Sequence, residues 1–157
     1  MTHDDLVQIA ARWLRGPQRC GVVMTDAGGG GLEIPDAIGF RRAGRYSIVV
    51  ECKASRGDFL RDRKKFHRQA GMGLGQRRYY LAPVGIVLTA DEVPAGWGLV
   101  EVNSAGRCRV VVKLPALAAY DPDIQPRATG VLYSAARKAQ SLALATVEEA
   151  PQGGTTP

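Results

Sequence analysis

Asp36, Glu51 and Lys53 have the residue types and the spacing that metal-assisted chemistry on a phosphodiester requires. If residues 46–53 form a strand, Glu51 and Lys53 lie on one face, about 7 Å apart, because side chains alternate between the two faces of a sheet. Mg²⁺ takes oxygen ligands and keeps several waters, so Asp36 and Glu51 suffice beside a substrate phosphate, and Mn²⁺ is an expected substitute. Lys53 would orient or deprotonate the attacking water, or stabilise charge that develops on phosphorus. The alternative is an ordinary edge strand with a solvated Glu51–Lys53 pair.

The sequence around these residues resembles a known superfamily of nucleases. Pro35 and Asp36, with Glu51-Cys52-Lys53 further along, form the pattern P-D-x₁₄-E-C-K, which resembles the PD-(D/E)XK nucleases. The run over residues 51–65 is more closely similar to the MmcB-like DNA repair proteins and related small phage proteins, whose pattern is roughly E-x-K-x-S-R-x-D-F-x-x-D-x-K. The resemblance covers residues 32–83 well. It implies a nuclease-like core with a restriction-endonuclease-like α/β fold, in which a mixed central β-sheet carries the two acids and the lysine and is flanked by α-helices.

A third acidic ligand for the metal is left open between three residues. Glu33 could reach the same cation if the backbone bends at Pro35, with simple exposure as the alternative. In many nucleases of the superfamily an acid near the start of the first helix joins the metal site, and the resemblance carries this role over to Asp5. The alternative for Asp5 is a helix cap with Thr2 that also favours the helix dipole. Asp26 is the remaining candidate.

Basic residues follow the motif immediately. Residues 53–78 include nine Lys or Arg and two acids, a balance of 9 − 2 = +7, whereas the whole chain carries a net charge of +6. We expect a helix that begins at Ser55 and places Arg61, Lys65 and Arg68 on one face. Because that face would adjoin a phosphodiester site, we expect it to bind the DNA backbone, with a solvated face as the alternative. The nucleic-acid-binding candidates are Ser55, Arg56, Arg61, Lys64, Lys65, Arg68 and Arg77.

Two loops are further candidates for contact with DNA. Arg41, Arg42 and Arg45 crowd the turn around Gly44 and are usable phosphate contacts, although turn arginines are commonly solvated. The glycine run over residues 28–31 is either a flexible hairpin tip or a loop that lies along DNA and orders on binding.

The hydrophobic pattern predicts one domain over residues 1–146 and a flexible tail over residues 147–157. An amphipathic helix begins after Thr2 and is stopped by Gly16-Pro17, and a closing helix covers residues 128–145. The expected strands cover residues 21–24, 35–40, 46–53, 78–83, 85–88, 98–102 and 107–113, the last pairing with the strand before it.

The composition is that of a folded intracellular protein, with 45% hydrophobic and 23% charged residues. Cys20, Cys52 and Cys108 are widely spaced, which predicts reduced core thiols rather than zinc ligands. No apolar run approaches the ~18 residues of a membrane span, and the N-terminus has no signal-peptide pattern. We therefore expect a cytoplasmic protein of a bacterium or a phage-infected host cell.

The expected function is Mg²⁺-dependent hydrolysis of DNA phosphodiester bonds, in DNA repair, recombination or phage DNA metabolism. One alternative is a non-catalytic DNA-binding or repair accessory protein that keeps the nuclease-like fold and the basic residues. Another is a phage protein that uses the fold to bind a host protein. Whether the chain forms a homodimer is left open.

Overall fold

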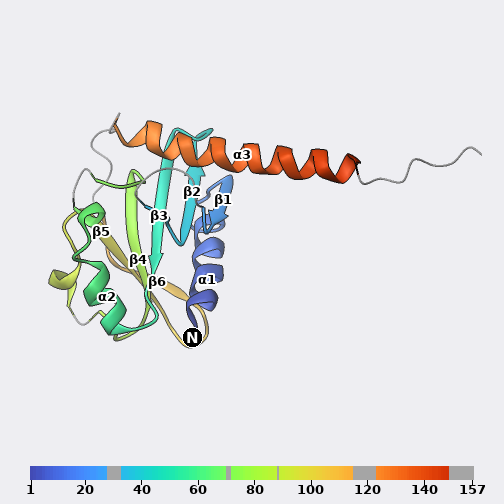
Figure 1. Ribbon diagram of the computed structural model, residues 1–157. Helices are drawn as coiled ribbons and strands as arrows, with labels where there is room; N and C mark the ends of the chain where they lie inside the picture. Colours follow the sequence, from blue (N-terminus) through green and yellow to red (C-terminus); the bar gives the residue numbers. More distant parts are fainter. Residues whose placement is uncertain (28–32, 70–71, 88, 115–122, 149–157) are drawn as a thin grey trace, which may run out of the picture.

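The computed structural model describes residues 1–27, 33–69, 72–87, 89–114 and 123–148 (Figure 1). Within these ranges, no helix combines the length and the apolarity needed to cross a membrane. The elements in chain order are α1 (His3–Arg15), β1 (Val22–Thr25), β2 (Ala37–Arg41), β3 (Tyr46–Cys52), α2 (Arg56–Asp62), the 3₁₀ helix η1 (Phe66–Arg68), β4 (Arg77–Pro83), the 3₁₀ helix η2 (Ala90–Glu92), β5 (Trp97–Val102), β6 (Cys108–Val112) and α3 (Ile124–Glu148).

The six strands form one sheet in the order β1-β2-β3-β4-β5-β6. The β1–β2, β2–β3 and β5–β6 pairs are antiparallel, while β3–β4 and β4–β5 are parallel. The carboxyl ends of β3, β4 and β5 therefore meet at one end of the sheet, and the β2–β3 turn lies at the other. The predicted α/β class with a mixed sheet is confirmed.

Helix α1 covers one face of the sheet and forms the larger core. Thr2 caps the helix, since its hydroxyl accepts from the Asp5 backbone N–H while the Asp5 carboxylate accepts from the Thr2 N–H. The apolar side of α1 packs against alternate residues of β3, namely Ile48, Val50 and Cys52. The predicted alternation of β3 is confirmed.

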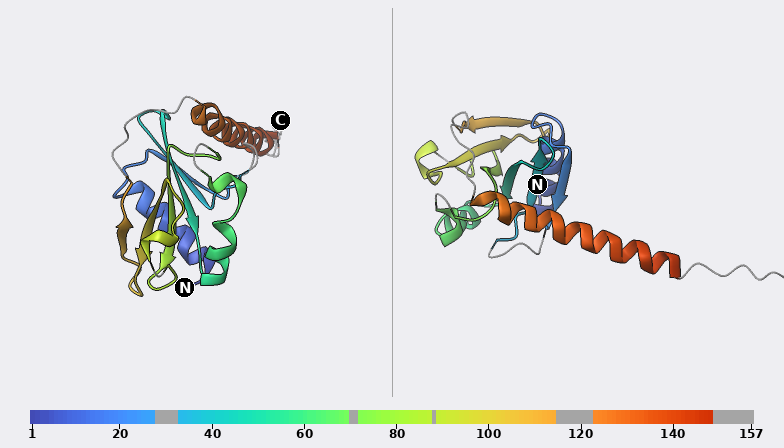
Figure 2. Two further views of the ribbon diagram at one scale, coloured as in Figure 1. Left: turned by 90° about the vertical axis from the view of Figure 1, so that its left-hand side faces the viewer. Right: turned by 90° about the horizontal axis from the view of Figure 1, so that it is seen from above.

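Helices α2 and α3 cover the opposite face of the sheet, as Figure 2 shows. Phe59 of α2 packs edge-on against Tyr80 of β4, with ring centroids 5.1 Å apart. Ala128 and Val131 of α3 join Val49 of β3 in a second small core. Because both faces of β3 are covered, Glu51 leaves the strand inside the protein and not at a solvated edge.

Three predicted elements differ in the structure. The strand predicted over residues 85–88 is wrong for the described residues 85–87, because Gly85 has φ +88° and the Ile86 N–H bonds back to Pro83 O at 3.3 Å, which makes a turn after β4. The helix predicted to run on from Ser55 ends at Asp62. Helix α3 is longer than predicted and reaches Glu148, so Val147 and Glu148 are not tail residues. Residues 28–31 and the rest of the predicted tail lie outside the described residues.

Candidate functional site

The end of β3 brings Asp36, Glu51 and Lys53 together. Ala37 pairs with Val50 across the β2–β3 ladder, so Asp36 lies beside the carboxyl end of β3. There Asp36 Oδ2 accepts the Cys52 backbone N–H at 2.7 Å, which fixes the carboxylate against the neighbouring strand. This side chain is 19% exposed and is the part of the trio open to solvent.

Glu51 is a buried carboxylate, with only 3% of its surface exposed. Its Oε2 lies 2.8 Å from an Arg68 terminal nitrogen and 3.5 Å from Lys53 Nζ. Its Oε1 is also buried, and none of the described residues donates a hydrogen bond to it. Burial raises the pKa of Glu51 to about 7, because the loss of water outweighs the attraction of Arg68 for the ionised form.

Lys53 is the second charge of the strand end and is 5% exposed. Its Nζ lies between two carboxylates, 3.5 Å from Glu51 Oε2 and 3.3 Å from Asp62 Oδ1. Burial lowers the pKa of Lys53, but the carboxylates of Glu51, Asp62 and Asp36 together raise it above its ordinary value. Lys53 is therefore a cation at neutral pH and not a free base.

Asp62, at the end of α2, connects this pair to Arg68. Arg68 Nε and one terminal nitrogen contact the two Asp62 oxygens at 2.7 and 3.0 Å, a two-pronged pairing. The Tyr80 hydroxyl donates to Asp62 Oδ2 at 3.1 Å, and Lys65 Nζ lies 2.8 Å from Oδ1. Burial raises the pKa of Asp62, but the bonds from Arg68 and Lys65 outweigh it and hold that pKa well below its usual range.

Glu33 is occupied by structural partners. Its Oε2 accepts the Leu74 backbone N–H at 2.6 Å. Its Oε1 pairs with Arg68 and with Arg78, the latter at 3.1 Å. Both arginines lie over the Trp97 ring, at 5.1 and 4.2 Å from its centroid. Glu33 thus anchors the loop before β4 to the site, and the simple exposure left open by the sequence is wrong.

The other two acids proposed as a third metal ligand lie in the first turn of α1 and directly after β1. The Asp5 carboxylate is used in the capping box of α1, and its pKa is lowered by the Thr2 hydrogen bonds. Asp26 follows β1 in a left-handed conformation, φ +50°, and its N–H lies 3.3 Å from Asp36 O. Among the described residues, no group of three or more His, Cys, Asp or Glu side chains is placed to hold a metal ion.

Asp36 and Glu51 nevertheless fit a hard divalent cation as a pair. Glu51 Oε1 is a buried oxygen to which no described group donates a hydrogen bond. Asp36 supplies a second carboxylate that is partly open to solvent. Two carboxylates are enough for Mg²⁺ when water and a phosphate complete its coordination.

The seven residues predicted to bind nucleic acid lie in different environments. Arg61 and Lys64 are exposed, Ser55 caps α2 by accepting the Asp58 N–H at 3.2 Å, and Arg77 begins β4. Arg56 and Lys65 form ion pairs with Glu92 and Asp62. Arg68 is only 3% exposed. The prediction of a continuous helical ridge is wrong, because the helix ends at Asp62 and Arg68 turns inward to three carboxylates.

Sequence reasoning missed two residues of the site. Asp62 joins Lys53 to Arg68, and its only sequence signal is its place in the D-F-x-x-D part of the motif. His3 Nε2 lies 3.4 Å from Asp36 Oδ1, and nothing in its sequence context indicates this contact.

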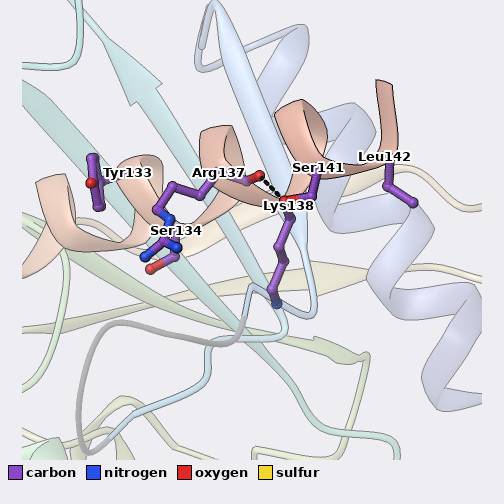
Figure 3. A pocket seen from close by; sticks show the side chains of 6 residues that line it. All are labelled: Tyr133, Ser134, Arg137, Lys138, Ser141 and Leu142. Carbon is purple, nitrogen blue, oxygen red and sulfur yellow. Dashed lines mark hydrogen bonds between the residues drawn. The ribbon is translucent and has the colours of Figure 1, made fainter. Parts of the chain in front are cut away.

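A second surface lies away from the site, on the outer side of α3. Figure 3 shows Tyr133, Arg137, Lys138 and Leu142 along this helix, with Ser141 Oγ donating to Arg137 O at 3.1 Å. The groups in view belong to one helix, and none of the carboxylates described above lies among them.

Comparisons with known proteins support the fold and do not supply an activity. No protein-family model matches the chain, and no curated protein matches it. The chain is similar to a solved structure of a protein of unknown function from Silicibacter pomeroyi, with 23% identity and a TM-score of 0.65 over 98% of each chain. That similarity shows that the same α/β fold extends over nearly the whole length of both proteins.

Proposed function

We propose that the protein is a metal-dependent nuclease that hydrolyses DNA phosphodiester bonds, with Asp36, Glu51 and Lys53 as its catalytic residues. The observation that carries this proposal is the buried, unpartnered Glu51 Oε1 beside the partly exposed Asp36 carboxylate. A buried carboxylate oxygen without a donor is costly in a purely structural cluster. A cation held by both carboxylates would compensate it.

In this proposal each protein group has a distinct role. Asp36 and Glu51 hold the cation, and the bond from Cys52 N–H keeps Asp36 oriented. A bound Mg²⁺ or Mn²⁺ would polarise the phosphate and lower the pKa of a coordinated water. Lys53 stays charged and is held between Glu51 and Asp62, so it can stabilise negative charge on the phosphate oxygens.

DNA is the proposed substrate because exposed positive charge lies next to this end of the sheet. Arg61, in the last turn of α2, and Lys64, just after α2 ends, are exposed, and the chain carries a net charge of +6. Such groups bind phosphates without reading sequence. DNA repair, recombination or phage DNA metabolism are the processes in which we place the activity.

A second candidate function is DNA binding without cleavage. The observation that favours it is the ion pair between Arg68 and Glu51 at 2.8 Å. Together with Lys53 and Arg78, Arg68 balances the negative charges of Glu33, Glu51 and Asp62 inside the protein. A cluster that is already neutral has less to gain from a cation.

Metal binding and cleavage distinguish the two. Calorimetric titration with Mn²⁺ should show binding that Glu51→Gln and Asp36→Asn each abolish or weaken strongly. Asp91→Asn removes an exposed carboxylate from η2 and is the matched control. Cleavage of labelled DNA should require the metal and be lost in the same two variants. Metal binding that is equal in all four proteins would refute the nuclease proposal.

A further inference from the structure

A basic pocket lies at the opposite end of the β2–β3 hairpin from Glu51. Its charged lining comes from Arg19, before β1, and from Arg41 and Arg42, at the end of β2. Leu132 of α3 forms part of its wall, because α3 passes over the hairpin turn (Figure 1). No acidic residue is among the described residues that line it.

The three arginines are not neutralised by the part of the protein that the structure describes. Arg19 and Arg42 make no hydrogen bond or ion pair through their side chains with described residues, and both are exposed. Arg41 lies over the Tyr46 ring, 5.9 Å from its centroid, and likewise has no acidic partner there. In contrast, Arg56, Arg68, Arg78 and Arg109 all pair with carboxylates.

The local electrostatics agree with an uncompensated positive charge. Burial raises the pKa of Tyr46, and Arg77, Arg41 and Arg42 act against that rise. Burial likewise raises the pKa of Cys20 to about 11, opposed by Arg41. The positive charges of Arg41, Arg42 and Arg77 favour an anion at this end of the hairpin.

The turn holds two of the arginines in a fixed arrangement. Arg42 and Ala43 are both left-handed, with φ +51° and +55°, and Gly44 N–H bonds to Arg41 O at 3.0 Å. Arg19 is left-handed as well, with φ +53°. Non-glycine residues adopt this conformation infrequently, so the pocket is made from a specific backbone rather than from an extended loop.

We infer that this pocket binds a phosphate group of a nucleic-acid backbone, at a position separate from Asp36 and Glu51. Arg41 follows Asp36 by five residues of extended chain, so the two ends of β2 are about 17 Å apart. That distance equals about five base steps of B-form DNA. The spacing of the two positions therefore matches that of phosphates along one duplex. The inference rests on the proposed function for the identity of the nucleic acid as DNA.

The test is DNA binding in the absence of divalent metal. The variant Arg19→Asn/Arg42→Asn removes two charges, and asparagine tolerates the left-handed conformation that both positions require. Lys113→Gln is the control, since Lys113 is an exposed cation just beyond β6, at the same end of the sheet but across it from β2. Fluorescence anisotropy with a labelled duplex, measured in EDTA over a range of salt concentrations, gives affinity and salt dependence.

Each neutralised phosphate contributes about 0.9 to the slope of log K against log salt. Loss of two such contacts should lower the affinity at about 0.1 M salt by about 2 × 0.9 log units, which is about 60-fold, and should make the slope smaller by about two. The affinity of Lys113→Gln should stay near that of the wild type. If the double variant matches the control, or the wild type binds no DNA, the inference is overturned.

Titration with inorganic phosphate separates a backbone phosphate from a free ion. Phosphate that binds the wild type while DNA affinity is unchanged in the double variant would assign the pocket to a free phosphate compound and contradict the inference. DNA that binds through the pocket but is never cleaved would support the inference and refute the nuclease proposal. The two proposals therefore fail through different results.

Discussion

Replacing Arg68 by methionine should remove the group on which the buried charges of the site depend. The guanidinium pairs with Asp62 at 2.7 Å and with Glu51 at 2.8 Å, and also with Glu33. Methionine keeps most of the side chain's volume over Trp97 and removes the charge. Glu33, Glu51 and Asp62 would stay buried with fewer cations beside them.

The expected loss is about 3–5 kcal/mol in the free energy of unfolding, the cost of leaving a buried charge without its partner. For a chain of this length it corresponds to a melting temperature lower by roughly 6–20 °C. Urea unfolding followed by circular dichroism at neutral pH measures this loss of free energy. Arg61→Met removes an exposed arginine from α2 and should change stability by no more than about 0.5 kcal/mol. A loss below about 1 kcal/mol for Arg68→Met would refute the view that these ion pairs hold the site together.

Three further predictions concern buried residues of the sheet. The pKa of Glu51 is about 7 in the folded protein and 4.5 ordinarily, so between pH 4.5 and 7 the folded state binds a proton that the unfolded state has lost. The free energy of unfolding should therefore fall by about 3 kcal/mol as pH rises from 4.5 to 7. Urea unfolding across that range checks it, and Glu51→Gln should remove the slope. Tyr80→Phe loses the hydrogen bond to Asp62 and should cost about 1–2 kcal/mol by the same assay. Gly98→Ala should destabilise by about 1–3 kcal/mol, since its Cβ would lie 2.3 Å from a tyrosine ring atom, whereas Gly21→Ala meets nothing within 4 Å and should be nearly neutral in thermal melts.

The arrangement of Asp36, Glu51 and Lys53 could be predicted from the sequence, because it depends on the alternation of side chains along a strand and on the pairing of two neighbouring strands. Alternation along β3 is a property of any strand, so the shared face of Glu51 and Lys53 could be predicted. The antiparallel partner strand then places Asp36 beside them, sixteen residues before the Cys52 N–H that it accepts. These contacts form within the β2–β3 hairpin and do not depend on distant parts of the chain.

The position of Arg68 could not be predicted in this way. The basic run after Ser55 has a helical pattern, yet the helix ends at Asp62, and Lys65 is extended with ψ 143°. Pairing of Arg68 with Glu33, thirty-five residues away, stabilises a break in the helix that local propensity does not contain. The environment of Glu33 could not be predicted for the same reason, since its partners come from the loop before β4 and from β4 itself.

We propose that Lys53 acts on DNA in a catalytic site. The most direct test of this proposal is single-turnover cleavage of one labelled DNA with Mg²⁺ or Mn²⁺, measured beside equilibrium binding of the same DNA, for wild type and Lys53→Met. If Lys53 stabilises charge formed in the transition state, the variant should cleave at least ~10²-fold more slowly with its DNA affinity little changed. Wild-type protein that binds the DNA but cuts it with neither metal would contradict the account.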